Sequence, residues 1–348
     1  MNKHGGYYGE NYQDIMDFSV NINPLGVPKT LIEVLKKELD KMVRYPEIDG
    51  ASEKEFLAQH LGLKSENLIL GNGATELIYL FARSIKSERV LIVKPTFTEY
   101  NKAFELEGSS IYEFYTGEEN DFSIEIEELA NKIDDIKPNV LVICNPNNPT
   151  GVFTELEKLI PVLNKLKDIK AHLFIDESFI DFTDRDSCIS LIDKYDIFIL
   201  RSMTKIFAVP GLRLGYGIAK QDIISKLNQM KEPWTINSLA LKSIQVLLKD
   251  SQYLDKTQHW YSEEKQFLYN GLKSLPNIKI IKSETNFFLL KLLKHDAAQL
   301  KKHLLNKKIF IRSCDDFQGL SDKYIRIAIK KREENTKILT EIRKYMED

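Results

Sequence analysis

The chain has little of several features that would assign it to a special class of protein. Its 348 residues include only three cysteines, Cys144, Cys188 and Cys314, which lie far apart and form no C-x-x-C pair. This spacing argues against a disulfide framework or a structural zinc site, and it predicts reduced thiols in a cytoplasmic protein without a metal. No apolar run approaches the roughly 20 residues that a membrane-spanning helix needs. We therefore expect no membrane segment.

An excess of one charge is also missing. Lysine and arginine together number 49 and aspartate and glutamate 51, so the formal net charge is −2. This balance gives no electrostatic reason to expect binding to nucleic acid or to an anionic membrane. The first residues, Met1 to Gly6, include no apolar signal region, and the chain shows no repeat and no low-complexity segment. A length of 348 residues fits one large domain or two moderate ones.

Short β-rich runs alternate with helical patterns from about residue 67 to residue 218. The predicted strands are residues 68–70, 90–93, 140–144, 172–175, 197–200 and 214–218. They are nearly continuous apolar runs, as in a sheet that helices cover on both faces. After residue 238 a long helix precedes strands and helices in mixed order. We expect an α/β fold with a large domain over 45–238 and a smaller α+β domain formed by 1–44 and 239–348.

Polar motifs follow five of these predicted strands. They are Gly71 to Thr75, Pro95-Thr96-Phe97, Asn145 to Gly151, Asp176-Glu177 and Arg201 to Lys205. Each one alone has an ordinary explanation, such as a loop or a helix cap. In open α/β sheets, however, ligands bind beyond the carboxyl ends of the strands. Five polar motifs at the same sheet edge therefore indicate a binding site.

Lys205 is unusual because it follows the apolar run of residues 196–200, whereas most lysines lie on solvated surfaces. Ser202 and Thr204 precede it, and Arg213 comes eight residues after it. A lysine that a buried strand delivers to a polar loop is a candidate for covalent chemistry. An amine, a carboxylate, an amide, hydroxyls and a guanidinium are together the groups that pyridoxal phosphate requires. A glycine-rich turn that opens a helix can hold the phosphate of this cofactor.

At these residues the sequence resembles the fold-type I pyridoxal phosphate enzymes of the aminotransferase class I and II group. The resemblance rests on Asn145 to Gly151, Asp176-Glu177 and Ser202-x-Thr204-Lys205 with Arg213, and it extends over nearly the whole chain. It implies that Lys205 forms the Schiff base with the cofactor, that Asp176 pairs with the pyridine nitrogen and that Asn148 bonds the phenolic oxygen. The residues implied at the cofactor phosphate are Gly73, Ala74, Thr75, Ser202, Thr204 and Arg213.

Two aromatic residues extend this resemblance. Phe97 occupies the position at which the family stacks an aromatic ring on the cofactor, although packing in the core would also explain it. Tyr45, in Arg44-Tyr45-Pro46, resembles the tyrosine that reaches the cofactor phosphate of the neighbouring subunit. The resemblance therefore implies a homodimer with shared active sites.

Within the group, the chain is similar to the threonine-phosphate decarboxylases and to the histidinol-phosphate aminotransferases. The stretches that resemble the decarboxylases are residues 4–6, 17–26, 233–237 and 311–314, while 283–286 and 332–335 resemble the aminotransferases as much. The favoured expectation is decarboxylation of L-threonine O-3-phosphate to (R)-1-aminopropan-2-yl phosphate, a step of cobalamin biosynthesis. Transamination of histidinol phosphate is the alternative. A non-catalytic regulator would carry an added nucleic-acid-binding module or lack the lysine, and neither is seen.

A phosphorylated amino-acid substrate needs anion-binding groups beyond those of the cofactor. Arg326 resembles the carboxylate-binding arginine of the family, and Arg312 resembles its neighbour in the decarboxylases. We expect His4 and Asn21 to help to hold the phosphate or the carboxylate. Surface arginines and a frayed terminus are the alternative explanations for the arginines and for His4. Many aminotransferases have a tyrosine three residues after the aspartate, whereas this chain has Phe179, which agrees with the decarboxylase pattern.

Overall fold

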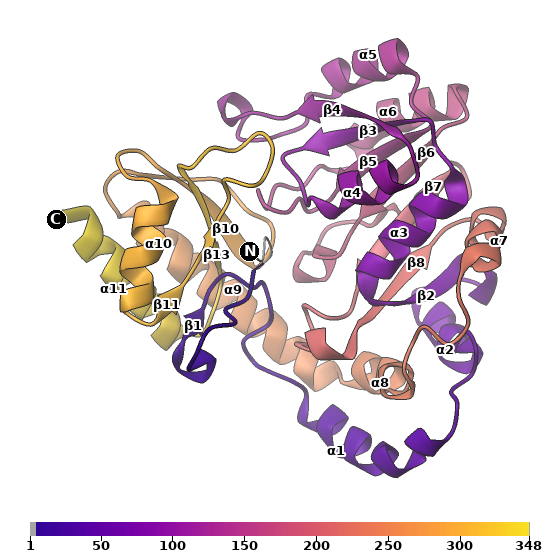
Figure 1. Cartoon of the computed structure of the whole chain (residues 1–348), viewed down its shortest axis with the longest axis horizontal. Helices are drawn as coiled ribbons and strands as arrows, with labels where there is room; N and C mark the ends of the chain where they lie inside the picture. Colours follow the sequence, from indigo (N-terminus) through magenta and orange to yellow (C-terminus); the bar gives the residue numbers. More distant parts are fainter. Residues whose placement is uncertain (1–4, 348) are drawn as a thin grey trace.

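The computed structural model describes residues 5–347, and its larger part is a seven-stranded sheet between layers of helices (Figure 1). The strand order is β2-β8-β7-β6-β5-β3-β4. All neighbouring pairs are parallel except those that β8 makes with β2 and β7. The strands are β2 (Leu68–Asn72), β3 (Arg89–Lys94), β4 (Ser110–Tyr115), β5 (Val140–Cys144), β6 (His172–Asp176), β7 (Ile197–Ser202) and β8 (Leu214–Ile218).

Helices cover both faces of this sheet, which explains the continuous apolar runs. Along β5, Leu141 and Ile143 belong to one hydrophobic cluster, and Val140 and Val142 belong to another. The first cluster includes side chains of α5 (Ile126–Ile136), α6 (Leu156–Asp168) and α8 (Ser238–Lys249). The second includes side chains of α3 (Gly73–Ile85), α4 (Glu99–Leu106) and α7 (Gln221–Met230). The predicted α/β class with a sheet covered on both faces is therefore confirmed.

A smaller lobe contains a four-stranded antiparallel sheet in the order β12-β13-β10-β9. Its strands are β9 (Ile278–Ile280), β10 (Phe287–Leu292), β12 (Arg312–Ser313) and β13 (Tyr324–Ala328), and its helices are α9 (Ser251–Lys273), α10 (Ala297–Asn306) and α11 (Arg332–Glu347). The N-terminal strand β1 (Met16–Asp17) pairs with β11 (Ile309–Phe310), so this part of the N-terminal segment folds back onto the lobe. The predicted boundaries between the two domains, at residues 45 and 238, stay a prediction.

The topology brings the carboxyl ends of β2, β3, β5, β6 and β7 to one edge of the sheet. Strand β2 runs in the same direction as β7 because both are antiparallel to β8, which lies between them. The loops after these five strands carry the five polar motifs of the sequence, so all of them converge on one edge. Within residues 5–347, no helix has both the length and the apolar character needed to cross a bilayer.

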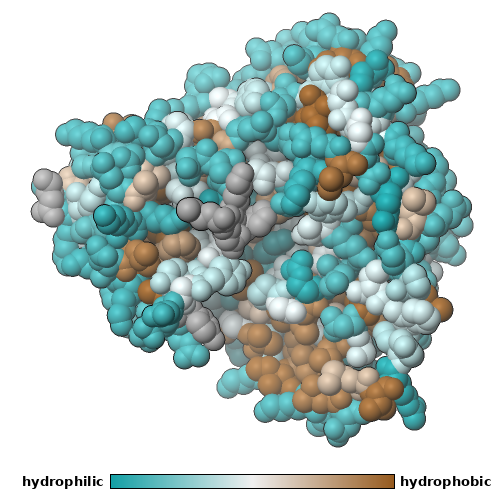
Figure 2. Space-filling model, in the orientation of Figure 1, coloured by the Kyte–Doolittle hydropathy of each residue, from teal (hydrophilic) through white to brown (hydrophobic). Residues whose placement is uncertain are grey.

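The face of the molecule in Figure 2 is largely hydrophilic, but hydrophobic side chains gather over α1 (Lys29–Glu38) and α8 in the lower part of the view. The N-terminal segment from residue 27 to residue 48 exposes several large apolar side chains in the single chain. They are Val27, Ile32, Leu39, Met42, Val43, Tyr45 and Ile48. We refer to these seven residues as the 27–48 patch. So large an exposed apolar surface is characteristic of an interaction site.

Candidate active site

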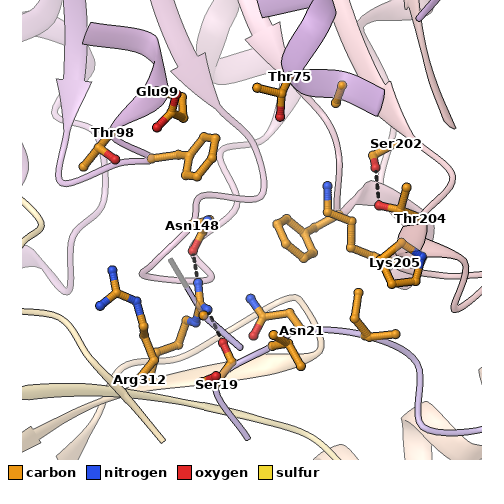
Figure 3. A pocket seen from close by; sticks show the side chains of 18 of the residues that line it. Ser19, Asn21, Thr75, Thr98, Glu99, Asn148, Ser202, Thr204, Lys205 and Arg312 are labelled. Carbon is orange, nitrogen blue, oxygen red and sulfur yellow. Dashed lines mark hydrogen bonds between the residues drawn. The ribbon is translucent and has the colours of Figure 1, made fainter. Parts of the chain in front are cut away.

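A cavity of about 480 Å³ lies where the carboxyl edge of the large sheet meets the smaller lobe. A second cavity of about 120 Å³ shares its floor and extends to Asp176. Together they are lined by most of the residues that the sequence singles out: Asn21, Ala74, Thr75, Phe97, Asn148, Asp176, Ser202, Thr204, Lys205, Arg213, Arg312 and Arg326. Figure 3 shows the labelled side chains facing one another across the larger cavity.

Lys205 reaches this cavity from the loop after β7, whose six residues are all buried. Its main-chain carbonyl accepts hydrogen bonds from the N–H groups of Asn23 at 3.1 Å and Ala208 at 3.3 Å, which fixes the loop. Its Nζ lies 5.3 Å from the centre of the Phe179 ring. Burial lowers the pKa of Lys205, although the nearby carboxylate of Asp176 opposes this shift. The neutral, nucleophilic amine is therefore accessible at a lower pH than for an exposed lysine.

Asp176 ends strand β6 and is only 5% exposed. Its Oδ1 accepts a hydrogen bond from the backbone N–H of Ser178 at 2.8 Å, and its Oδ2 accepts one from the Tyr100 hydroxyl at 2.6 Å. A buried carboxylate held at both oxygens suits a protonated ring nitrogen as its partner. The next residue, Glu177, instead accepts a hydrogen bond from Arg201 Nε at 2.9 Å and therefore belongs to a structural ion pair.

An anion-binding corner forms where β2 passes into α3. Gly73 has a φ of +78°, and a Cβ built on it would lie 2.5 Å from a guanidinium nitrogen of Arg213. The guanidinium therefore lies against the first turn of α3, whose free N–H groups also attract anions. The hydroxyls of Ser202 and Thr204 lie 2.8 Å apart near the same corner. This donor set fits a phosphate group.

Asn148 and Arg326 meet at the side of the cavity that faces the smaller lobe. The Asn148 amide oxygen accepts a hydrogen bond from Arg326, which also donates to the carbonyl of Ser19 at 2.7 Å (Figure 3). Burial lowers the pKa of Arg326 to about 10, so its guanidinium remains protonated at neutral pH. Among residues 5–347, the buried Nε of Arg326 and Oδ1 of Asn21 have no hydrogen-bond partner. Such atoms are normally paired, so they fit a cavity that binds a polar ligand.

Arg312 lies opposite Arg326 in the pairing of β12 with β13. It donates to both carboxylate oxygens of Asp316, at 2.8 and 2.6 Å, and its guanidinium lies 5.2 Å from the centre of the Phe317 ring. The side chain of Arg312 is 11% exposed and Arg326 is 6% exposed. Neither of them is a surface arginine, and both line the larger cavity.

Tyr45 does not line the cavity of the single chain. Tyr45 is 86% exposed, and its ring centre lies 5.3 Å from that of Trp234. Its predicted role needs a second chain and stays a prediction. His4 lies outside the described residues. Phe97 lines both cavities and also packs against Tyr100 with ring centres 5.7 Å apart, so it has a core contact as well as a face in the site.

The sequence analysis missed several residues that line the two cavities, notably Thr98, Glu99, Tyr100, Ser19 and Phe317. Thr98 and Glu99 directly follow the Pro95-Thr96-Phe97 motif, so extending that motif by two residues would have included them. Tyr100 gives no local signal. It comes from within α4, and its contact with Asp176 joins residues 76 positions apart.

The fold and the site define a pyridoxal phosphate-dependent enzyme of fold type I. The sequence matches the model of the family Aminotransferase class I and II over residues 13–342, so the chain belongs to this family. The family uses pyridoxal phosphate. The residues around the cavity fit this cofactor, because they include an amine that faces the cavity, a buried carboxylate, an amide and an anion-binding corner.

Individual relatives carry two different activities in their names. The threonine-phosphate decarboxylase of Salmonella typhimurium is 34% identical over 97% of this chain and 93% of its own length. The structure of a histidinol-phosphate aminotransferase from Clostridium acetobutylicum has a TM-score of 0.89 at 35% identity and covers 96% of this chain and 99% of that one. The structure of L-threonine-O-3-phosphate decarboxylase from Porphyromonas gingivalis has a TM-score of 0.87 at 25% identity, with coverages of 96% and 100%.

Proposed function

We propose that this chain is a threonine-phosphate decarboxylase, which converts L-threonine O-3-phosphate to (R)-1-aminopropan-2-yl phosphate and carbon dioxide. The observation that carries the proposal is a pair of arginines with little exposed surface, Arg312 and Arg326, on adjacent strands of the smaller lobe. Both line the cavity and neither belongs to the groups assigned to the cofactor. A substrate with a carboxylate and a phosphate needs two such cationic groups. The similarity to the decarboxylase of Salmonella typhimurium supports this choice.

In this proposal, three residues would hold the reactive part of the cofactor: the Lys205 amine at its aldehyde, the Asp176 carboxylate at its ring nitrogen and the Asn148 amide at its phenolic oxygen. The N–H groups of residues 73–75 hold the phosphate together with Ser202, Thr204 and Arg213, and Phe97 packs on the ring. Pyridoxal phosphate, when bound, supplies an electron sink in conjugation with the Cα atom of the substrate.

The choice of reaction depends on how the chain orients the substrate, because only a bond perpendicular to the cofactor ring is weakened. Arg326 and Arg312 hold the two anionic ends, with help from Asn21 and His4, so that the Cα–carboxylate bond takes that position. Carbon dioxide would leave on cleavage of this bond, and Lys205 Nζ would donate a proton to Cα. Phe179 lies beside Lys205 without a hydroxyl, so it adds no donor to that of Asn148 at the phenolic oxygen.

Histidinol-phosphate aminotransferase is the second candidate. The similarity to the Clostridium acetobutylicum structure, with a TM-score of 0.89 at 35% identity, favours it. Its substrate is also a phosphorylated amine, and it would use the same lysine and the same anion-binding groups. The difference is that histidinol phosphate carries no carboxylate at Cα, so the bond held perpendicular to the ring would be its Cα–H bond.

A homodimer with shared active sites is part of the proposal. It is supported by the 27–48 patch, in which Val43 is 88% exposed and Tyr45 is 86% exposed. If a second copy covers this patch, the Tyr45 hydroxyl is available to the cofactor phosphate of that copy. The dimer would then bury an apolar surface and complete the phosphate site at the same time.

A direct comparison of substrates tests the proposed reaction. Purified protein loaded with pyridoxal phosphate is incubated with L-threonine O-3-phosphate and assayed for carbon dioxide. In parallel it is incubated with histidinol phosphate and 2-oxoglutarate and assayed for glutamate. We expect carbon dioxide in the first assay and no glutamate in the second. Glutamate without carbon dioxide would reject the decarboxylase and leave the aminotransferase.

The variant Arg312→Lys tests the role of the arginine pair. Lysine keeps the charge but loses the two-pronged guanidinium geometry that fixes the angle of an anion. We expect decarboxylation to fall by at least about tenfold while the cofactor stays bound, with pyridoxamine phosphate accumulating because a loosely held substrate presents its α-hydrogen. The matched control is Arg185→Lys, since Arg185 forms a surface ion pair with Glu155 and its side chain is 40% exposed. Normal decarboxylation by the Arg312 variant would contradict this role.

A further inference from the structure

Tyr100 is a buried residue with a hydroxyl that the reaction described above does not use. It lies in α4, is 1% exposed and lines the smaller cavity beside Asp176. Its hydroxyl donates to Oδ2 of Asp176 at 2.6 Å. The ring packs edge to face against Phe97 and Phe174, with centre distances of 5.7 and 5.9 Å.

Packing alone does not account for a tyrosine at this position. A phenylalanine would make the same ring contacts with Phe97 and Phe174, and it would not place a hydroxyl in the protein interior. Burying a hydroxyl is unfavourable unless it forms a hydrogen bond. The bond to Asp176 offsets this cost, and it is charge-assisted because its acceptor is a carboxylate. The hydrogen bond to Asp176 therefore explains why this position carries a hydroxyl.

We propose that Tyr100 is a positioning residue that orients the Asp176 carboxylate toward the ring nitrogen of pyridoxal phosphate. The inference rests on the proposed cofactor arrangement, in which Asp176 accepts a hydrogen bond from that nitrogen. The backbone N–H of Ser178 holds Oδ1 at 2.8 Å and Tyr100 holds Oδ2, so the two bonds fix the plane of the carboxylate. Each oxygen has a second lone pair with which it can accept the ring N–H.

The surroundings keep Tyr100 a donor at every working pH. Burial, together with the nearby carboxylate of Asp176, raises the pKa of Tyr100 well above its ordinary value. Burial also raises the pKa of Cys144, the residue paired with Asp176 across β5 and β6, to about 12, so this thiol stays neutral. The Tyr100 hydroxyl therefore stays protonated and remains a donor to the Asp176 carboxylate.

The variant Tyr100→Phe removes the hydroxyl and keeps the ring, and two ligands report on it. One is pyridoxamine 5′-phosphate, which binds without a covalent bond to Lys205, and the other is its analogue with carbon in place of the ring nitrogen. We expect wild-type protein to bind the nitrogen ligand more tightly than the carbon analogue. Tyr100→Phe should reduce this preference by about tenfold, because a less well oriented Asp176 forms a weaker charge-assisted hydrogen bond with the ring nitrogen. Its affinity for the carbon analogue should hardly change.

The control is Tyr195→Phe, because Tyr195 is 2% exposed and its hydroxyl donates to Asn164 at 2.8 Å, outside the lining of both cavities. This variant should keep the full preference for the nitrogen ligand. If Tyr100→Phe weakens both ligands equally, or changes neither, Tyr100 has only a structural role and the inference is overturned. The variant Asp176→Asn distinguishes a failure of the role proposed for Tyr100 from a failure of the proposed cofactor arrangement. If it also leaves the preference unchanged, the proposed cofactor arrangement itself fails.

Discussion

Two lysines, Lys94 and Lys205, lie close to the carboxyl edge of the large sheet, and desolvation lowers the pKa of both. Lys94 is 1% exposed, has a pKa of about 8 and donates to the side chain of Asn101. Lys205 faces the cavity beside Phe179. A lowered pKa therefore does not distinguish the two lysines. They differ in that the amine of Lys205 faces the cavity, whereas Lys94 does not line it.

Borohydride reduction of the holoenzyme tests this distinction. The reagent should fix a pyridoxyl group on the peptide that contains Lys205, as detected by mass spectrometry. The matched control is Lys94→Met, which removes the other amine of lowered pKa near this sheet edge and should leave the labelling intact. Lys205→Met should abolish it. A label on another lysine in the wild-type protein would overturn the cofactor arrangement.

The pH dependence of the Lys205 amine has a predicted sign. Burial lowers the pKa of Lys205. The negative charge of Asp176 opposes this effect because it raises the pKa, whereas the positive charge of Arg213 lowers the pKa further. Asp176→Asn should therefore move the reactivity of Lys205 to lower pH, and Arg213→Gln should move it to higher pH. Reductive methylation of the apoprotein with formaldehyde measures this reactivity, because only the neutral amine reacts. Shifts in the same direction for both variants would contradict this electrostatic picture.

At the scale of elements, the apolar runs of the sequence are sufficient to locate six of the seven strands of the large sheet. The seventh, β4, was not predicted because it is an edge strand with mostly exposed or half-buried residues, Ser-Ile-Tyr-Glu-Phe-Tyr, and has no continuous apolar run. The polar motifs were found because they follow buried strands directly. The position of Tyr100 was not found, because it depends on how α4 packs on the sheet.

The turn between β2 and α3 gives a prediction at the scale of elements. Gly73→Ala places a Cβ on a residue with a φ of +78° and only 2.5 Å from the Arg213 guanidinium. The control is Gly62→Ala, since Gly62 has a φ of +68° and no neighbour within 4 Å of its Cβ position. Both variants should lose about 1–2 kcal/mol of unfolding free energy in urea, from backbone strain.

Only Gly73→Ala should also weaken the retention of pyridoxal phosphate, because it displaces Arg213 from the first turn of α3. The dissociation constant of the cofactor, measured by the change in its absorption, separates the two variants. Equal cofactor affinity in both would mean that this corner does not hold the phosphate.

At the scale of the whole molecule, the cavity joins residues from Gly5 to Arg326. The sequence could indicate the groups on the large sheet, because they share one edge. The resemblance to a family was needed for Arg312 and Arg326, since their strands belong to another sheet and no local pattern relates the two sheets. The hydrogen bond from Arg326 to the carbonyl of Ser19 likewise depends on the folding of the N-terminal segment against β13.

The exposed N-terminal segment leads to the prediction at the largest scale. If the 27–48 patch is covered by a second copy, Val43→Asp should dissociate the protein to monomers, because it would bury a carboxylate in an apolar contact. The control is Leu106→Asp at the end of α4, where the side chain is 68% exposed but lies outside the patch. Sedimentation should give a dimer for the wild type and the control, and a monomer for Val43→Asp.

Loss of the dimer should also weaken cofactor retention if Tyr45 completes the phosphate site of the other chain. Tyr45→Phe keeps the ring and its contact with Trp234, so it should leave the dimer intact. It should weaken cofactor binding by about 1.5–3 kcal/mol, the value of one charge-assisted hydrogen bond. Val43→Asp should then lower cofactor affinity at least as much as Tyr45→Phe, since a monomer lacks the same hydroxyl. A monomeric variant with full cofactor affinity and full activity would refute the shared site, even if the wild-type protein is a dimer.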